Sequence, residues 1–261
     1  MDKKEQKVDI INIMSTNNMP HVSICDFDFV KDKLLTCRKI TEIPKNAKSI
    51  IMTVFPYKVN QKAPKGISRY AAVPDYHVVC QKMLAAAVSE LKRCFPNNEF
   101  CFFVDNSPIP EVAAAVHSGL GVIGKNGLLI HEKYGSYVFI GEIVTDLELK
   151  ADKGGKKCLD CGQCSAACPT KLHKDTCLSA VNQQKKPLEE AQIEQILKSG
   201  YVWGCDICSE VCPMNQGTPP TYIKEFIDGY REEYKMDESH EGRAYAWRGP
   251  DIIKRNAKLF K

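Results

Sequence analysis

Four closely spaced cysteines followed by a proline most constrain what this chain can fold into. Cys158, Cys161, Cys164 and Cys168 precede Pro169 and form the pattern C-x2-C-x2-C-x3-C-P. In bacterial proteins this spacing wraps three thiolates around one 4Fe-4S cluster and directs the fourth to a second cluster. The sequence therefore predicts an electron-handling protein whose C-terminal part is organised around iron–sulfur clusters.

A second, incomplete cysteine pattern predicts the remaining ligands. Cys205, Cys208 and Cys212, with Pro213, repeat the x2 and x3 spacings, and Cys177 is the nearest thiol that can complete the set. In two-cluster proteins the last cysteine of each pattern ligates the other cluster. We expect the first cluster on Cys158, Cys161, Cys164 and Cys212. We expect the second cluster on Cys205, Cys208, Cys177 and Cys168.

Zinc and disulfide bonds are the alternative uses of these cysteines. Structural zinc sites usually pair two CxxC units and need neither a third thiol nor the CP ending. Disulfides need an oxidising compartment, yet residues 1–14 contain no apolar stretch of signal-peptide length. We therefore expect a reduced, cytoplasmic protein. The other cysteines are expected to be small buried hydrophobes: Cys25, Cys37, Cys80, Cys94 and Cys101.

Composition indicates an ordinary globular protein. The chain has 261 residues, 44% hydrophobic and 26% charged, enough for one large domain or two modest ones. Its apolar run at residues 136–144 is broken by Gly141 and Glu142. The run is too short for a membrane helix, which needs roughly 18 to 20 residues, so we expect no membrane segment. The net charge of +4 neither requires nor excludes a nucleic-acid partner.

A change in composition near residue 150 predicts the domain organisation. Segments that alternate apolar and polar residues give way there to a lysine- and glycine-rich stretch and then to the cysteines. We divide the chain into three parts: residues 1–150, 151–220 and 221–261.

Within the first part, patterns of apolar residues predict alternating strands and helices. Residues 49–55 and 99–104 are typical of short buried strands. Residues 75–95 and 108–117 are typical of amphipathic helices. Residues 128–131 and 136–145 are expected to pair as a hairpin.

The cysteine-rich part and the tail are expected to carry three further helices. Pro187 and Gly200 are placed as the first residue and the terminator of one helix. The segments 222–234 and 247–260 have helical patterns.

Asp105 stands out at the end of an apolar strand. It precedes Asn106, Ser107 and Pro108, and from this pattern alone a turn former or helix cap is favoured. His77, taken singly, is interpreted as a structural residue. The glycines of residues 119–124 follow a predicted helix, whereas a dinucleotide-binding fingerprint follows a strand.

Taken together and in order, seven segments resemble the epoxyqueuosine reductases, a family of cobalamin-dependent iron–sulfur enzymes of queuosine biosynthesis in tRNA. The resemblance covers residues 43–215. Its motifs are KSIIMTVFPY, ISRYA with DYH, VDNSPIPE, GLGVIGKNGLL, YGSYVFIGEIVTDLEL, CLDCGQCSAACPT and GCDICSEVCPMN.

The resemblance implies a fold, cofactors and partners. The fold is an α/β (α+β) cobalamin-binding domain followed by a bacterial two-cluster ferredoxin-like domain. The cofactors are cobalamin and two 4Fe-4S clusters. The partners are tRNA, as substrate, and an external low-potential electron donor. We expect a monomer.

The resemblance also implies site residues. Asp105 matches the aspartate that opens the D-x2-P-x2-E motif and is therefore expected to be the catalytic proton donor. An acid near neutral pH needs a raised pKa, which we expect from the corrin ring and residues 100–104. Residues expected near the corrinoid by motif position are Ser68, Tyr70, Lys125, Asn126, Gly127, Ser136 and Gly141.

The sequence of residues 221–261 does not decide which substrate the protein acts on. Family members usually continue into a helical repeat domain that contributes to tRNA binding, and only its beginning is matched before Lys261. One alternative is an enzyme with the same cofactors and another substrate, such as a reductive dehalogenase-like or corrinoid-reducing activity. The other is a simple two-cluster electron carrier.

Overall fold

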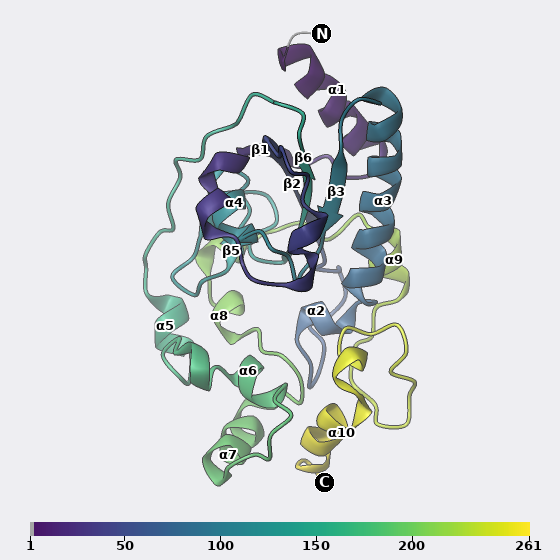
Figure 1. Cartoon of the computed structure of the whole chain (residues 1–261). Coiled ribbons are helices and arrows are strands. Elements are labelled where there is room, and N and C mark those ends of the chain that lie inside the picture. The colour runs from purple at the N-terminus through teal and green to yellow at the C-terminus, as the bar shows by residue number, and fades with distance from the viewer. Residues whose placement is uncertain (1–2) are drawn as a thin grey trace. The chain divides into compact units, whose positions relative to one another are not determined.

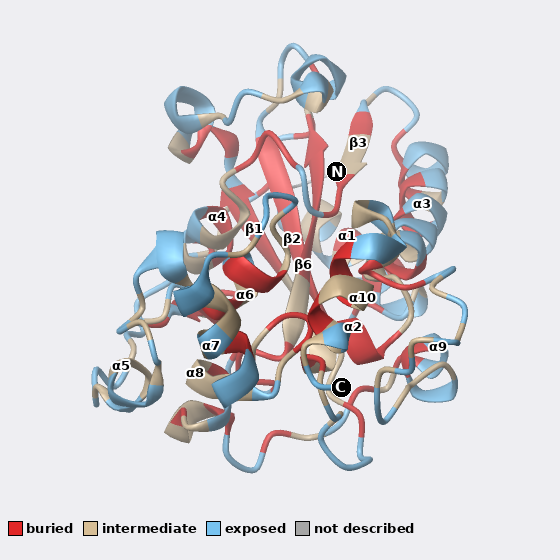
Figure 2. Cartoon of the chain, turned by 90° about the horizontal axis from the view of Figure 1, so that it is seen from below, coloured by how far each residue is buried: buried red, intermediate tan, exposed pale blue. Residues whose placement is uncertain are grey.

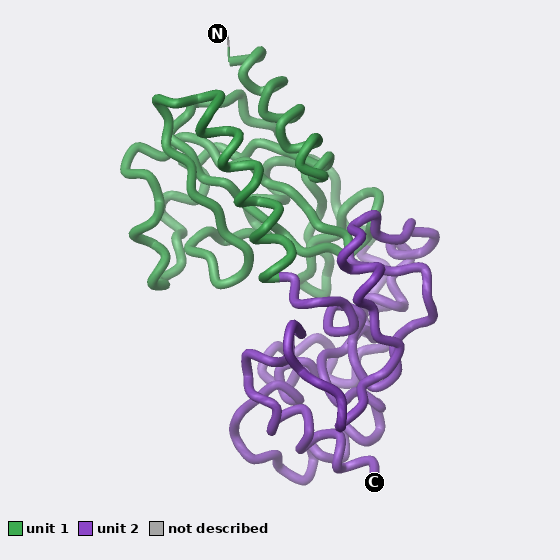
Figure 3. Tube along the Cα trace, turned by 90° about the vertical axis from the view of Figure 1, so that its right-hand side faces the viewer, with its two compact units in different colours: residues 1–56, 77–159 green, residues 57–76, 160–261 purple. Residues whose placement is uncertain are grey.

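The computed structural model describes residues 3–261, which form two compact units (Figure 3). Unit 1 comprises residues 1–56 and 77–159, and unit 2 comprises residues 57–76 and 160–261. The segment 57–76 thus groups with the C-terminal part of the chain, although it precedes most of unit 1 in sequence. The predicted division at residues 150 and 220 stays a prediction.

Unit 1 is built on a four-stranded antiparallel sheet in the order β1-β2-β6-β3 (Figure 1). The strands are β1 (Val22–Asp26), β2 (Ser49–Pro56), β3 (Phe100–Phe103) and β6 (Val138–Thr145). β2 pairs with β6 along its whole length. Every residue of β2 is buried (Figure 2), the pattern of a central strand covered on both faces.

Helices cover both faces of this sheet. The helices of unit 1 are α1 (Lys3–Thr16), α3 (Tyr76–Cys94) and α4 (Glu111–His117). Ala114 and Ala115 of α4 pack in one core cluster with Ile140 and Val144 of β6. On the opposite face, a Cβ on Gly141 would lie 2.6 Å from the Phe55 ring of β2 and 3.1 Å from Leu84 of α3. Because successive strand residues alternate faces, residue 142 of β6 belongs to the face that α4 covers.

A second, two-stranded sheet in unit 1 shows that the predicted hairpin is wrong. β4 (Val122–Ile123) pairs with β5 (Leu129–Ile130). The eight-residue β6 pairs instead with β2 and β3. Of the predicted pairing only a single bridge forms, between His131 and Gly135. The physical reason is that β6 finds a full-length hydrogen-bonding partner in β2, which the two-residue β5 cannot offer.

Unit 2 consists of short helices joined by turns. They are α2 (Arg69–Ala72), α5 (Gln163–Ala167), α6 (Leu178–Asn182), α7 (Glu190–Ser199), α8 (Ile207–Glu210), α9 (Lys224–Asp228) and α10 (Pro250–Lys258). At the start of α7, Gln192 accepts a hydrogen bond from the Glu189 N–H at 3.1 Å. At its end, Gly200 takes the left-handed conformation with φ of 75°.

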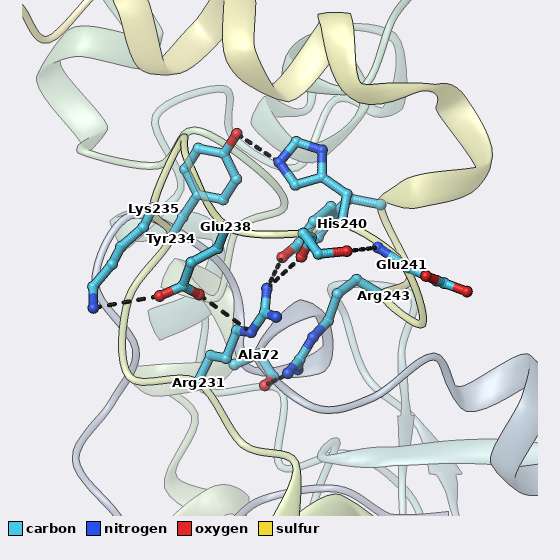
Figure 4. Close-up of polar contacts among 10 residues, drawn as sticks. Ala72, Arg231, Tyr234, Lys235, Glu238, His240, Glu241 and Arg243 are labelled. Carbon is cyan, nitrogen blue, oxygen red and sulfur yellow. Dashed lines mark hydrogen bonds and ion pairs between the residues drawn. The ribbon is translucent and has the colours of Figure 1, made fainter.

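The main apolar core of unit 2 joins segments that are distant in sequence. Its buried members come from residues 57–76, from the region before α8 and from the end of the chain: Ile67, Ala71, Ala72, Val202, Trp203, Tyr245, Ile252 and Ile253. Polar contacts join Ala72 to the region of residues 231–243 (Figure 4). Arg243 donates to the Ala72 carbonyl at 3.0 Å, and Arg231 donates to the Ser239 carbonyl at 2.9 Å.

The predicted strands and main helices are confirmed with adjusted ends. Strands expected at 49–55 and 99–104 correspond to β2 and β3, and helices expected at 75–95 and 108–117 correspond to α3 and α4. The tail helices α9 and α10 are shorter than predicted. Helix α1 and strand β1 were not predicted. Cys94 is exposed, so its expected burial is wrong, because it is the last residue of α3.

Candidate cluster-binding loops and catalytic aspartate

The first cysteine loop turns tightly around the short helix α5. Asp160 and Gly162, which lie between the first thiols, have left-handed φ values of 48° and 76°. Helix α5 carries Cys164 and ends at Cys168, whose N–H donates to the Cys164 carbonyl at 3.1 Å. Left-handed residues let a short loop reverse its direction, as a loop must when closely spaced thiols bind one cluster.

Cys168 has the electrostatic environment of a metal-binding thiol. Burial acts to raise its pKa, but hydrogen bonds from Thr170 and Leu172 outweigh it and lower the pKa. The Leu172 N–H donates to Cys168 Sγ at 3.4 Å. A lowered pKa favours the thiolate, which is the form that binds iron.

The second cysteine loop lies against the first. Helix α8, which carries Cys208, contacts α5, which carries Cys164. Burial is the main cause that raises the pKa of Cys205 to about 12, and the charges of Cys208 and Cys177 add to the increase. The predicted binding of Cys177, Cys205 and Cys208 to one cluster stays a prediction.

The chemistry of this donor set fits iron–sulfur clusters. All eight predicted ligands are free thiols: Cys158, Cys161, Cys164, Cys168, Cys177, Cys205, Cys208 and Cys212. A 4Fe-4S cluster takes one thiolate on each of its four irons, so two clusters need eight such ligands.

Asp105 lies on a strained turn between β3 and α4. Its φ is 51° and that of Asn106 is 40°, in a region that few residues other than glycine adopt. Asp105 Oδ2 lies 3.2 Å from His77 Nε2, and Oδ1 accepts a hydrogen bond from the Asn106 N–H at 2.7 Å. Helix α4 begins only at Glu111, so the cap favoured by the local pattern is wrong. Backbone strain of this kind is concentrated at functional positions.

The protein by itself leaves this carboxylate accessible. The Asp105 side chain is 54% exposed, whereas Phe103 and Val104 are buried in the core and do not cover it. The desolvation expected at Asp105 stays a prediction. His77, interpreted as structural from sequence, is the partner that orients the carboxylate. The two residues are 28 positions apart, and no local pattern connects them.

Three of the residues predicted near the corrinoid form the turn between β4 and β5. Lys125 and Gly127 are exposed, Asn126 is half-buried, and Gly127 has open space where a side chain would be. On either side of the turn, Ile123 is 53% exposed and Leu128 is 40% exposed. The predicted contact of this turn with the corrinoid stays a prediction.

Ser68 and Tyr70 lie in unit 2, next to the second cysteine loop. Within residues 3–261 the fully buried Ser68 Oγ has no hydrogen-bond partner, and a Cβ on Gly204 would meet it at 2.0 Å. The Tyr70 hydroxyl accepts a hydrogen bond from Trp203 Nε1 at 2.9 Å. Both residues therefore pack against the backbone of residues 203–204, which directly precedes Cys205. Their predicted contact with the corrinoid stays a prediction.

Ser136 and Gly141, the other two predicted residues, are buried in unit 1. A Cβ on Gly141 would lie 2.6 Å from the Phe55 ring, so packing alone requires a glycine there. Their predicted contact with the corrinoid also stays a prediction.

The fold and the cysteine loops define an iron–sulfur oxidoreductase. Residues 157–215 match a family described as a 4Fe-4S double cluster binding domain. Residues 38–106 match a second family, described as Epoxyqueuosine reductase QueG, DUF1730. No helix within residues 3–261 has the length and apolar character to cross a bilayer.

Similar proteins identify the family. An epoxyqueuosine reductase of Synechocystis sp. is 36% identical over 205 residues, covering 72% of this chain and 70% of the relative. One from Lactococcus garvieae is 31% identical over 241 residues, covering 81% and 68%. The solved epoxyqueuosine reductase of Streptococcus thermophilus is 26% identical, with a TM-score of 0.80 over 97% of this chain and 80% of that one. This chain belongs to the epoxyqueuosine reductase family.

Another solved structure shares the fold. It is an epoxyqueuosine reductase crystallised with an epoxyqueuosine-modified tRNA-Tyr stem loop. Its TM-score is 0.84 at 22% identity, over 99% of this chain and 81% of that one. The similarity supports the α+β fold with its cluster-binding unit.

Proposed function

We propose that this protein reduces epoxyqueuosine in tRNA to queuosine. Family membership supports this reaction, and one observation in the structure carries it. Asp105, at the position where the family motif has its proton donor, is an accessible carboxylate on a strained turn, with both oxygens in contact with a polar neighbour. Such an arrangement presents an acid to a substrate in a defined orientation.

The cofactors of the proposed reaction are two 4Fe-4S clusters and cobalamin. The eight thiols of unit 2 and its entry loop would hold the clusters in the pairing that the sequence predicts. We place the corrinoid-binding surface of unit 1 at the turn of residues 124–128 and its exposed apolar neighbours. When bound, these groups supply low-potential electrons and a strongly reducing cobalt centre, which no amino-acid side chain can provide.

Asp105 has a specific task in this chemistry. An epoxide that becomes an alkene loses its oxygen, which needs protons to leave as water. Asp105 Oδ2 would hold one of these protons, and the contact with His77 Nε2 fixes the direction of the carboxyl group. The Asn106 N–H holds the other oxygen in place. A corrin ring over the exposed carboxyl would exclude water and thereby favour its protonated form.

Unit 2 offers a basic surface for the proposed tRNA substrate. A groove of about 770 Å³ is lined by Lys174, Lys185, Lys186 and Arg248, together with Cys177 and neutral polar residues. Lysine and arginine in such a groove attract the phosphate backbone without reading its sequence. An external low-potential electron donor is the second partner. We place the working enzyme in the cytoplasm as a monomer.

The proposed function is tested on tRNA that carries epoxyqueuosine. Anaerobically purified protein is reconstituted with cobalamin, reduced, and incubated with this tRNA. The digested nucleoside should lose the mass of one oxygen atom. A corrin absorption band that survives desalting, without this mass change, would indicate an enzyme with another substrate. Retention of clusters without any corrin band would indicate an electron carrier.

A further inference from the structure

A fully buried glutamate lies in the middle of the unit 1 sheet. Glu142 is in β6, opposite Met52 of β2 and opposite Phe103 of β3, and its exposure is 0%. An ionised carboxylate in this position carries a large desolvation penalty, so the neutral acid is the resting form of Glu142.

Other carboxyl groups around Glu142 also favour its neutral form. Burial is the main cause that raises its pKa well above the ordinary value, and the charge of Glu111 is the next. A hydrogen bond from the Ser107 side chain and the charge of Lys39 act to lower the pKa without reversing the shift, while the charge of Asp105 raises it further. Burial is the main cause that raises the pKa of the Cys101 thiol, on β3, to about 12, and the charge of Glu142 adds to the increase.

Glu111 lies between the buried glutamate and the proposed acid. It is the first residue of α4 and is half-buried. Burial, with the charge of Asp105 as the second cause, raises its pKa to about 7. The charge of Asp105 thus contributes to the raised pKa of both glutamates, and the charge of Glu111 contributes to that of Glu142. The three carboxyl groups form a series of increasing depth, from the exposed Asp105 through Glu111 to the fully buried Glu142.

The proposed reaction needs more protons than Asp105 holds. Converting the epoxide to an alkene breaks two C–O bonds and forms one C=C π bond. The substrate gains two electrons, which the proposed clusters deliver, and the oxygen leaves as water with two protons. Asp105 can donate one of these protons, so the second must reach the same place from another group or from solvent.

We propose that Glu111 and Glu142 form a buried proton store that recharges Asp105 during each turnover. The role rests on the proposed function. The neutral Glu142 passes its proton through Glu111 to the Asp105 carboxylate, and the store refills from solvent afterwards. Both glutamates act through Asp105 and do not contact the substrate. A solvent-shielded store matters because a substrate and corrinoid that cover Asp105 also separate it from bulk water.

The first test measures protonation directly and does not depend on any substrate. Infrared pH-difference spectra of the cluster-loaded protein should show a protonated carboxylic acid at pH 8, above the pKa of about 7 at which Glu111 ionises. Glu142→Gln should remove this signal, because the amide keeps the shape but has no acidic proton. Glu148→Gln is the matched control: Glu148 follows the same strand, but its side chain is 61% exposed, and it should leave the signal unchanged. A wild-type protein with no protonated carboxyl at pH 8 overturns the proposal.

The second test measures turnover on epoxyqueuosine-tRNA. Glu142→Gln should lower kcat about tenfold or more with KM unchanged, since a lost proton route affects only the chemical steps. Wild-type kcat should fall as pH rises through about 7, where Glu111 loses its proton, and Glu111→Gln should abolish this limb. A purely structural role predicts that Glu142→Gln retains the wild-type rate and pH profile, and that result refutes the proton store while leaving the proposed function intact. A wild-type protein that shows the infrared signal but never converts the tRNA overturns the proposed function and, with it, this role.

Discussion

Replacing Glu111 by glutamine should stabilise the protein, and the gain should depend on pH. In the folded protein the pKa of this carboxyl is raised to about 7 by burial and by the charge of Asp105. In the unfolded chain it ionises near its ordinary value of 4.5. A raised pKa means that the folded state binds the proton more tightly. The wild type therefore loses stability as pH rises from the unfolded pKa to the folded pKa.

The magnitude follows from the size of the rise. One pKa unit corresponds to about 1.4 kcal/mol, so a rise from 4.5 to about 7 corresponds to about 3 kcal/mol at neutral pH and above. Glutamine does not ionise and avoids this loss. For a protein of this size, about 3 kcal/mol shifts the melting temperature by roughly 6 to 12 °C. We expect the melting temperature of Glu111→Gln to exceed that of the wild type by this amount at pH 8, and the difference to shrink toward pH 4.5.

The assay is a series of thermal melts of cluster-loaded wild-type and variant protein between pH 4.5 and pH 8. Glu148→Gln serves as the control, because Lys3 lowers the pKa of that exposed carboxyl and no such gain is expected. A melting-temperature difference for Glu111→Gln that stays constant across this range would show that Glu111 is ionised in the folded state. The electrostatic argument for the proton store would then be wrong.

Three further substitutions probe the rest of the site. Asp105→Asn should keep clusters and corrinoid but lower turnover by roughly 10²- to 10⁴-fold, and a normal rate would remove its role as the acid. Cys177→Ser should reduce the iron content from about eight to about four atoms per chain, while Cys94→Ser, an exposed cysteine outside both loops, should not change it. Gly204→Ala should destabilise unit 2 by more than about 1 kcal/mol, because φ is 70° and the new Cβ would lie 2.0 Å from Ser68 Oγ. A chemical unfolding midpoint equal to that of the wild type would contradict this last expectation.

The sequence alone predicted the features that depend on short spacings. The cysteine patterns, the strand at residues 49–55 and the helix at residues 75–95 each depend on residues that are neighbours along the chain. Their chemistry or periodicity is complete within a short segment, so it can be read without knowing the fold. The motif around Asp105 is equally local, and its order relative to the other segments indicated the family.

Only the tertiary structure decided which distant residues meet. Alternating apolar positions could not show that β6 pairs with β2 and not with β5, because the choice depends on the whole sheet. The contact between His77 and Asp105 and the burial of Glu142 are likewise results of packing between separate elements. In the sequence, Glu142 is one charge that interrupts an apolar run. In the fold it is a fully buried carboxyl group, and desolvation by the surrounding sheet and helix favours its protonated form.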